Sequence, residues 1–166
     1  PAPIVLIMDS VNVSCGGFSN GKASVAVSGG TPGYTYNWSD GDTVGIGDSV
    51  IHLPADEVSV IVTDANFCMD TGSVNITEPD TLFLSINKQD ILCFDDSNGI
   101  AEAIVTGGTP GYSYSWTMGG NSVGNTATVN DLGPGVAVVV VIDSNSCSIT
   151  DSATIIEPTV LSVSLN

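Results

Sequence analysis

The sequence predicts an all-β chain made of tandem β-sandwich repeats, and three observations support this fold class. Its apolar residues, mostly Val, Ile, Leu and Ala, come in short runs with turn-forming Gly, Pro, Ser, Thr, Asn and Asp between them. Such punctuation, about every 8 to 12 residues, is typical of short strands joined by turns. No stretch keeps the apolar period of a helix over several turns. Finally, the chain repeats itself.

The repeat is visible without gaps at a shift of 78 residues. Residues 15–38 align with residues 93–116, and 14 of the 24 positions are identical. After one inserted residue the shift is 79, and the apolar residues near the C-terminus then align with the opening strand of the second repeat. We therefore expect a first repeat over 1–78 and a second over 79–157. Residues 158–166 should be the first strand of a following repeat or a donor strand.

Each repeat should contain about seven strands, which suggests a sandwich. In the first repeat the predicted strands are 4–8, 11–14, 22–28, 34–39, 48–53, 58–64 and 70–76. Pro32 and Gly33 fit the central positions of a type II turn between the third and fourth strands, because proline presets the first φ and glycine accepts the positive φ of the second.

Three aromatic residues alternate along the fourth strand of each repeat and therefore share one face. They are Tyr34, Tyr36 and Trp38, and Tyr112, Tyr114 and Trp116. They could fill the core or form an exposed platform for sugar rings. We favour the core, because a small sandwich has few other large residues with which to fill its centre.

The charge of the chain argues against several classes of function. Two Lys, no Arg and one His stand against 18 acidic residues, a formal charge of −16. This charge excludes nucleic acid as a partner. An enzyme is not expected, and no catalytic residue is assigned, because acid–base and nucleophilic catalysis usually needs cationic partners that are nearly missing here. The longest apolar run, 136–142, is too short to insert into a membrane.

The repeated motifs resemble a known family. In order they are a Cys, Asn-Gly, Val-Ser-Gly-Gly-Thr-Pro-Gly-Tyr-x-Tyr-x-Trp, Val-Thr-Asp-Ala-Asn-x-Cys and Ile-x-Glu-Pro. This order is similar to the SprB repeat of very large surface adhesins of gliding Bacteroidetes. The resemblance implies an immunoglobulin-like module, export by the type IX pathway, and surface adhesion or gliding. The family usually has Tyr where Val58 and Ala137 stand, and Gly where Phe67 and Ser146 stand.

Each repeat has two cysteines, just before the third strand and just after the last turn. Metal binding would favour closely spaced Cys pairs or nearby His, and a catalytic thiol would need a cationic neighbour. We therefore predict the disulfides Cys15–Cys68 and Cys93–Cys147, which would place the protein outside the cytoplasm. The family resemblance further implies a location at the cell surface.

Oxygen-bearing side chains cluster at two kinds of turn. They are Asp64 and Asn66 with Asp143 and Asn145 at a hairpin, and Asp95 and Asp96 before a glycine. Such groups are weak candidates for calcium. We favour Asx-turns, in which the side chain caps its own backbone, and expect no cofactor apart from this calcium alternative.

Five triplets read Asp, a hydroxyl residue, then an aliphatic residue. Their hydroxyl residues are Ser10, Thr43, Ser49, Thr81 and Ser152. The triplet resembles the O-glycosylation signal of Bacteroidetes, so these residues are candidate glycosylation sites. The alternative is that strands often begin with a turn Asp followed by β-formers.

Two apolar faces have no evident cover. One is Val136, Val138, Val140 and Ile142, on what should be the solvent face of a strand, and the other is Leu161, Val163 and Leu165. We predict an interface at each, with a neighbouring repeat or an identical subunit. The alternative for the first face is that the long turn 118–127 covers it.

The sequence thus favours a non-enzymatic structural and adhesive repeat segment of a cell-surface adhesin or extracellular filament. Its expected partners are neighbouring repeats or identical subunits, with surface polysaccharide as a further candidate. The competing hypothesis is a carbohydrate- or calcium-dependent binding module attached to an exported enzyme. For that module the aromatic triplets and the Asp clusters would be the site.

Overall fold

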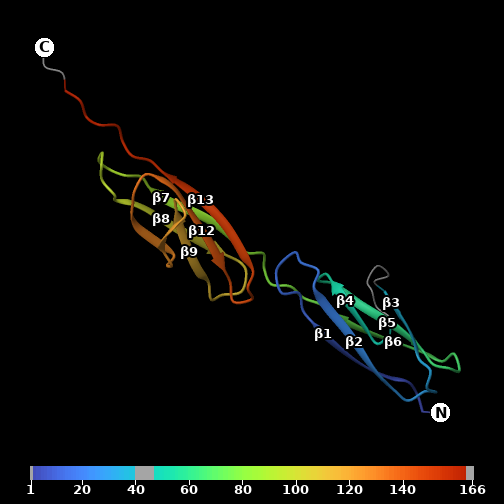
Figure 1. The fold of residues 1–166 in the computed structure, drawn as a ribbon. Helices are drawn as coiled ribbons and strands as arrows, with labels where there is room; N and C mark the ends of the chain where they lie inside the picture. The colour runs from blue at the N-terminus through green and yellow to red at the C-terminus, as the bar shows by residue number, and fades with distance from the viewer. Residues whose placement is uncertain (1, 40–46, 164–166) are drawn as a thin grey trace. The chain divides into compact units, whose positions relative to one another are not determined.

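The chain forms two compact units, Pro1–Pro79 and Asp80–Asn166. The structure is a computed structural model that describes residues 2–39 and 47–163. Every strand pair in this part of the chain is antiparallel, and none of its residues lies in a helix. The all-β fold class is therefore confirmed (Figure 1).

In its described residues, 2–39 and 47–79, the first unit is a sandwich of two three-stranded sheets. One sheet has the order β1-β2-β4 and the other β3-β5-β6. Their bounds are β1 Val5–Val11, β2 Gly21–Ser28, β3 Thr35–Trp38, β4 Ser49–Leu53, β5 Glu57–Thr63 and β6 Met69–Asn75. Ala23 and Val25 of one sheet and Val58, Val60 and Val62 of the other belong to the same buried core.

The strand predicted at 11–14 is wrong. Strand β1 continues to Val11, which pairs with Lys22, and residues 12–20 form a loop. Asparagine side chains hold this loop: the Ser14 N–H donates to Asn20 Oδ1 at 3.0 Å, and the Thr77 N–H to Asn12 Oδ1 at 3.0 Å. Side-chain bonds of this kind compete with a ladder, so the alternating sequence there does not form a second strand.

The second unit has one more strand than the described part of the first. Its sheets have the orders β11-β8-β7 and β10-β9-β12-β13. The bounds are β7 Phe83–Gln89, β8 Gly99–Thr106, β9 Ser113–Met118, β10 Asn121–Gly124, β11 Thr128–Leu132, β12 Gly135–Ile142 and β13 Ser148–Ile155. The residues expected to form only a long turn contain β10, which extends the sheet by pairing with β9.

The aromatic triplets belong to the cores. Trp38 is 8 % exposed and Trp116 is fully buried. The four tyrosines pack against the same clusters, and the Tyr34 and Tyr112 hydroxyls donate to the carbonyls of Gly29 and Gly107 at 2.5 and 2.6 Å. The prediction of an aromatic core is confirmed.

The repeated glycines stand where a side chain would not fit. A Cβ on Gly99 would lie 2.7 Å from Ile155 Cγ2 and 2.9 Å from the Leu132 carbonyl oxygen, and Gly21 has a matching environment. This explains the repeated Asn-Gly at the start of β2 and β8. Gly33 and Gly111 both have φ +112°, the positive value that the predicted Pro-Gly turn needs.

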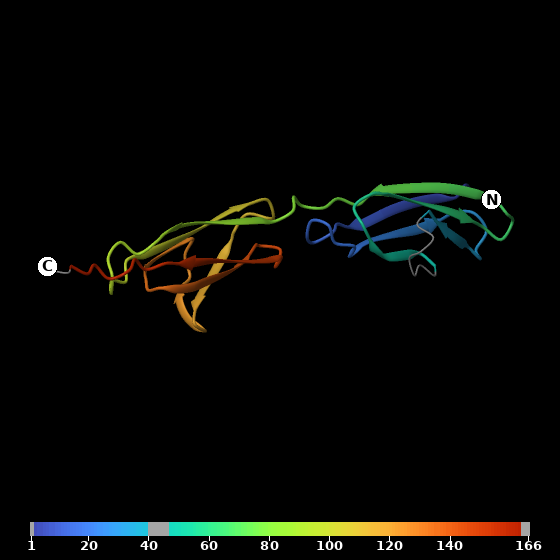
Figure 2. The ribbon, with the colours of Figure 1, turned by 90° about the horizontal axis from the view of Figure 1, so that it is seen from above.

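Each unit has two ends, because its strands all run lengthwise (Figures 1 and 2). We call the end at which the chain enters the first strand of a unit, β1 or β7, the entrance end. The entrance end also carries the β5–β6 turn in the first unit and the β12–β13 turn in the second. The chain leaves the last strand of a unit, β6 or β13, at the opposite end, which we call the exit end. The exit end carries the loop 12–20 in the first unit and the loop 90–98 in the second. The repeated motifs therefore divide into one set for each end.

Candidate functional site

The exit end of each unit ties the departing chain to the loop that carries the first cysteine. In the first unit the Val13 N–H donates to the Thr77 carbonyl at 2.9 Å, and the Gly17 N–H to Glu78 Oε2 at 2.6 Å. In the second, the Ile91 N–H bonds the Ile156 carbonyl at 3.0 Å, and the Asp95 N–H bonds Glu157. The repeated Glu-Pro therefore acts as an anchor for this loop.

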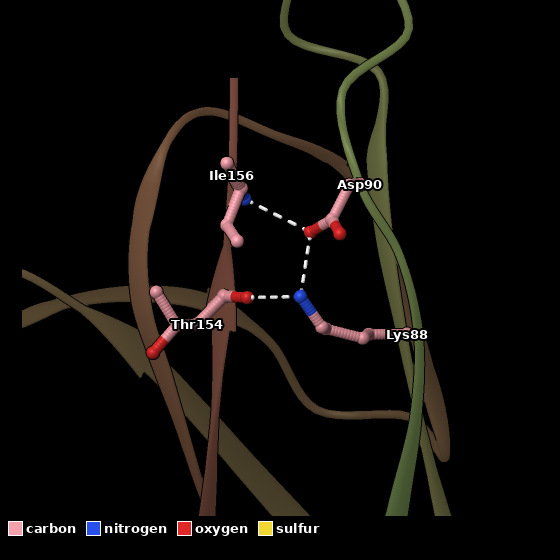
Figure 3. A network of polar contacts seen from close by, with 4 residues as sticks. All are labelled: Lys88, Asp90, Thr154 and Ile156. Carbon is pink, nitrogen blue, oxygen red and sulfur yellow. Dashed lines mark hydrogen bonds and ion pairs between the residues drawn. The ribbon is translucent and has the colours of Figure 1, made fainter. Parts of the chain in front are cut away.

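The exit end of the second unit also holds an ion pair (Figure 3). Lys88 Nζ lies 2.7 Å from Asp90 Oδ1 and donates to the Thr154 carbonyl at 2.6 Å, and the Ile156 N–H donates to Asp90 Oδ1 at 2.9 Å. The hydrogen bond from Lys88, followed by that from Ile156, lowers the pKa of Asp90. Asp90 thus performs in the second unit what the neutral Asn12 performs in the first, with a lysine to balance its charge.

The entrance end is organised around one buried aspartate in each unit. Asp64 Oδ1 accepts the Asn66 and Cys68 N–H groups at 2.8 and 2.9 Å, and its Oδ2 accepts the Thr31 N–H at 2.9 Å. The pKa of Asp64 is lowered chiefly by the bond from Thr31, against the opposing effect of burial. The repeated Gly-Gly-Thr-Pro loop is therefore fastened to the β5–β6 turn.

Asp143 repeats this arrangement in the second unit. Its carboxylate accepts N–H groups from Asn145, Cys147 and Thr109 at 2.8, 2.9 and 2.8 Å. Burial raises the pKa of Asp143, but the bonds from Thr109, Cys147 and Asn145 together outweigh it, so the net shift is downward. The bonds from Asn66 and Asn145 are the predicted Asx-turns, which are confirmed.

The calcium candidates do not form a cluster of ligands in the structure. Asp95 and Asp96 are exposed loop residues, and Asp96 accepts a long bond of 3.3 Å from Asn98 Nδ2. Within residues 2–39 and 47–163, no three His, Cys, Asp or Glu side chains come together as metal ligands.

The predicted disulfides are wrong in their pairing. Cys68 and Cys93 are free and exposed, whereas Cys15 and Cys147 are disulfide-bonded. The reason is topological: Cys15 lies at the exit end of the first unit and Cys68 at its entrance end, and Cys93 and Cys147 are separated in the same way. A strand of seven residues puts about 20 Å between the two ends. A disulfide needs Cα atoms roughly 4.4 to 6.8 Å apart.

The predicted apolar face of β12 is partly open. Ala137, Val139 and Val141 fill the core face and are fully buried, as expected. On the other face Val136 is 48 % and Ile142 41 % exposed. Val138 and Val140 between them are half-buried. Because β10 extends the sheet edge, the turn 118–127 does not cover this face, and that alternative is wrong.

The remaining candidate residues are mostly at the surface. Thr81 and Ser152 are exposed, Ser10 and Ser49 are half-buried, and Thr43 lies outside the described residues. Leu161 and Val163 are 90 % and 79 % exposed, and Leu165 lies outside the described residues. No strand forms over residues 158–163. The described residues also include no helix long and apolar enough to cross a membrane.

The bonding state of the cysteines and the apolar residues beside the free ones were not predicted from the sequence. The free cysteines have large apolar neighbours, Phe67 and Met69 beside Cys68, and Leu92 and Phe94 beside Cys93. All four are exposed, by 84, 70, 67 and 52 %. The bonded cysteines have small neighbours instead, Ser14 and Gly16, and Ser146 and Ser148. Comparing the residues beside each cysteine between the two repeats would have revealed this difference.

The chain was compared with known structures and known proteins. It is similar to the three N-terminal domains of the bacteriophage RB49 highly immunogenic outer capsid protein (TM-score 0.50, 17 % identity), covering 95 % of this chain and 59 % of that one. It is also similar to the I-band fragment I67–I69 from titin (TM-score 0.53, 12 % identity), covering 93 % and 65 %. The likeness shows an immunoglobulin-like β-sandwich fold, as predicted. No curated protein matches the chain.

A family model described as the SprB repeat matches residues 8–43 and 85–121. One stretch lies in each unit. Both include the loop of the first cysteine, the Asn-Gly and the Gly-Gly-Thr-Pro-Gly-Tyr motif. Each unit therefore contains one stretch that matches the SprB repeat, in agreement with the resemblance that the sequence motifs indicate.

Proposed function

We propose that this chain is a non-enzymatic structural and adhesive segment of a large bacterial cell-surface adhesin or extracellular filament, acting in surface attachment or gliding. One observation carries the proposal: in each SprB-type repeat the chain enters at one end and leaves at the opposite end. Both ends are tied by bonds from the repeated motifs, such as Thr31 with Asp64 and Gly17 with Glu78. Such a module can be added in series without changing its fold.

The use of polar groups supports a role without catalysis. Asp64 and Asp143 are buried aspartates whose oxygens accept backbone N–H groups and thereby fix loops. The indoles of Trp38 and Trp116 are buried and donate to the Gly47 and Thr126 carbonyls at 3.1 and 3.0 Å. They offer no stacking platform for a sugar ring, so the sugar-binding alternative loses its main site.

The charge and the cysteines support a place outside the cell. A net charge of −16 on 166 residues keeps such segments soluble and apart from one another. Disulfide-bonded Cys15 and Cys147 fit an oxidising compartment. We further propose that Ser10, Thr43, Ser49, Thr81 and Ser152 carry O-linked glycans there.

The test uses monovalent Fab fragments raised against the purified chain. They should label intact cells of the source bacterium and reduce attachment or movement over a surface. A Fab against a cytoplasmic protein of the same cells is the control and should label only permeabilised cells. Labelling by the first Fab that also requires permeabilisation would refute surface display. Surface labelling without any effect on attachment or movement would leave a scaffold role and refute the adhesive one.

A further inference from the structure

The four cysteines divide by bonding state as well as by position. Cys15, at an exit end, and Cys147, at an entrance end, are disulfide-bonded. Cys93, at the other exit end, and Cys68, at the other entrance end, are free. Because the two ends of one unit are about 20 Å apart, no disulfide can join the two cysteines of one unit.

The two free thiols are exposed on loops with a fixed backbone. The Cys68 N–H donates to Asp64 Oδ1, and its carbonyl accepts the Asp64 N–H, both at 2.9 Å. The Cys93 carbonyl accepts the Asp96 N–H at 3.3 Å, and the adjacent Leu92 N–H donates to Asn98 Oδ1 at 3.0 Å. An ordered loop with an accessible sulfur loses little entropy when it forms a bond.

Both free thiols also lie between large exposed apolar side chains. Phe67 and Met69 flank Cys68, and Leu92 and Phe94 flank Cys93. At the corresponding positions beside Cys147 and Cys15 the residues are Ser146, Ser148, Gly16 and Ser14. In the loop of Cys15 the exposed aromatic residue, Phe18, lies three residues from the cysteine and not beside it. Large exposed apolar residues directly on both sides of a free cysteine indicate a surface that a partner covers.

We propose that copies of this chain join head to tail through a disulfide between Cys93 of one copy and Cys68 of the next. Leu92 and Phe94 would pack on Phe67 and Met69 of the next copy. The apolar contact brings the sulfurs together against the repulsion of two chains of charge −16 each. Exit end and entrance end differ in sequence, so the contact is heterologous and extends into a filament.

The bond forms by oxidation. The two thiols lose two protons and two electrons, and one S–S bond forms. The electrons pass to a small disulfide oxidant, whose own S–S bond breaks to give two thiols. The reaction runs through a mixed disulfide between the oxidant and one cysteine, which the second thiolate resolves.

The test uses the full chain in oxidised and reduced glutathione. Denaturing, non-reducing electrophoresis should show a ladder of covalent multimers, and peptide mass spectrometry should find Cys93 linked to Cys68 of a different, isotope-labelled copy. Cys68→Ser and Cys93→Ser should each remain monomeric, whereas an equimolar mixture of the two should form dimers and nothing larger. Raising the salt concentration should speed the reaction, since it screens the repulsion.

The apolar contact has its own variant. Phe67→Ser with Met69→Ser, which copies the residues beside Cys147, should slow multimer formation about tenfold, because the apolar cover is lost. Ile51→Ser is the control and should leave the rate unchanged, because Ile51 is exposed on β4, in the other sheet of the unit and 17 residues from Cys68 in sequence. Symmetric Cys93–Cys93 or Cys68–Cys68 dimers from the single variants, Cys68–Cys93 bonds within one copy, or no ladder would each overturn the proposal. Because the readout is covalent linkage, it does not depend on surface display.

Discussion

The carboxylate of Asp64 accepts the backbone N–H of Thr31, 33 residues away in the chain, at 2.9 Å. The bond joins the Gly-Gly-Thr-Pro loop to the β5–β6 turn, and Asp143 makes the same bond with Thr109 at 2.8 Å. The Gly-Gly-Thr-Pro motif and the Asp-x-Asn motif, which the sequence shows only as separate repeated segments, are therefore joined by hydrogen bonds at the entrance end. Because these bonds stabilise the ionised carboxylate, the protonation of Asp64 and Asp143 links the stability of the entrance end to pH.

Asp64→Asn and Asp143→Asn should each destabilise their own unit and flatten its acid response. The folded pKa of both residues lies below the ordinary value of 3.8, so each carboxylate contributes stability that is present above pH 3.8 and is lost as the pH falls through the folded pKa. Urea unfolding followed by tryptophan fluorescence, at about pH 7 and about pH 3, measures this. The exposed Asp151→Asn is the control. An acid response as steep in the variants as in the parent chain would contradict the assignment.

Much of the fold follows from the sequence because its signals are local. Alternation places Ala137, Val139 and Val141 in the core, and the Pro-Gly turn and the aromatic triplets are where the pattern puts them. The cysteine pairing could not be predicted in this way. A separation of 53 residues does not show which end of a sandwich each cysteine occupies. The end depends on how many times the chain changes direction between the two cysteines. The strand wrongly predicted at 11–14 precedes Cys15 and does not change this number; what the sequence does not show is that β3 and β4 both run from the entrance end toward the exit end.

Ser146→Gly should stabilise the second unit by about 0.5 to 1 kcal/mol. Ser146 has φ +67° and Phe67 has φ +65°, at the position where SprB repeats usually carry glycine. A residue with a Cβ is strained in this left-handed conformation, and glycine relieves the strain. Thermal unfolding of the two variants Ser146→Gly and Ser148→Gly makes a matched comparison. Ser148 lies in β13, where glycine should instead lower the stability. Equal effects of the two changes would show that the strain is not significant.

Val138→Thr with Val140→Thr should weaken association between chains and leave the second unit folded. The two side chains lie on the half-exposed face of β12, whose first-unit counterparts are Ser59 and Ile61. Stability should change by less than about 1 kcal/mol, as for other surface positions. Sedimentation velocity measures the association. The core variant Val139→Thr is the control and should cost roughly 1 to 3 kcal/mol, because it buries a hydroxyl. If the double variant unfolds the unit while association is unchanged, the face belongs to the core.

Lys88 and Asp90 stand where the first repeat has Ser10 and Asn12, and we expect their contributions to the stability of the second unit to depend on each other. Lys88→Ser alone leaves Asp90 without its cation, so the pKa of Asp90 should rise toward its ordinary value and the second unit should lose stability. Asp90→Asn alone leaves the lysine without its carboxylate. The double variant restores Ser and Asn, the pair that the first unit has as Ser10 and Asn12, where the Asn12 amide oxygen accepts the Thr77 N–H. A double-mutant cycle by urea unfolding should therefore give a favourable coupling that shrinks as salt is added. Strictly additive effects at low salt would show that the ion pair contributes nothing and that the Ile156 N–H bond alone holds the loop.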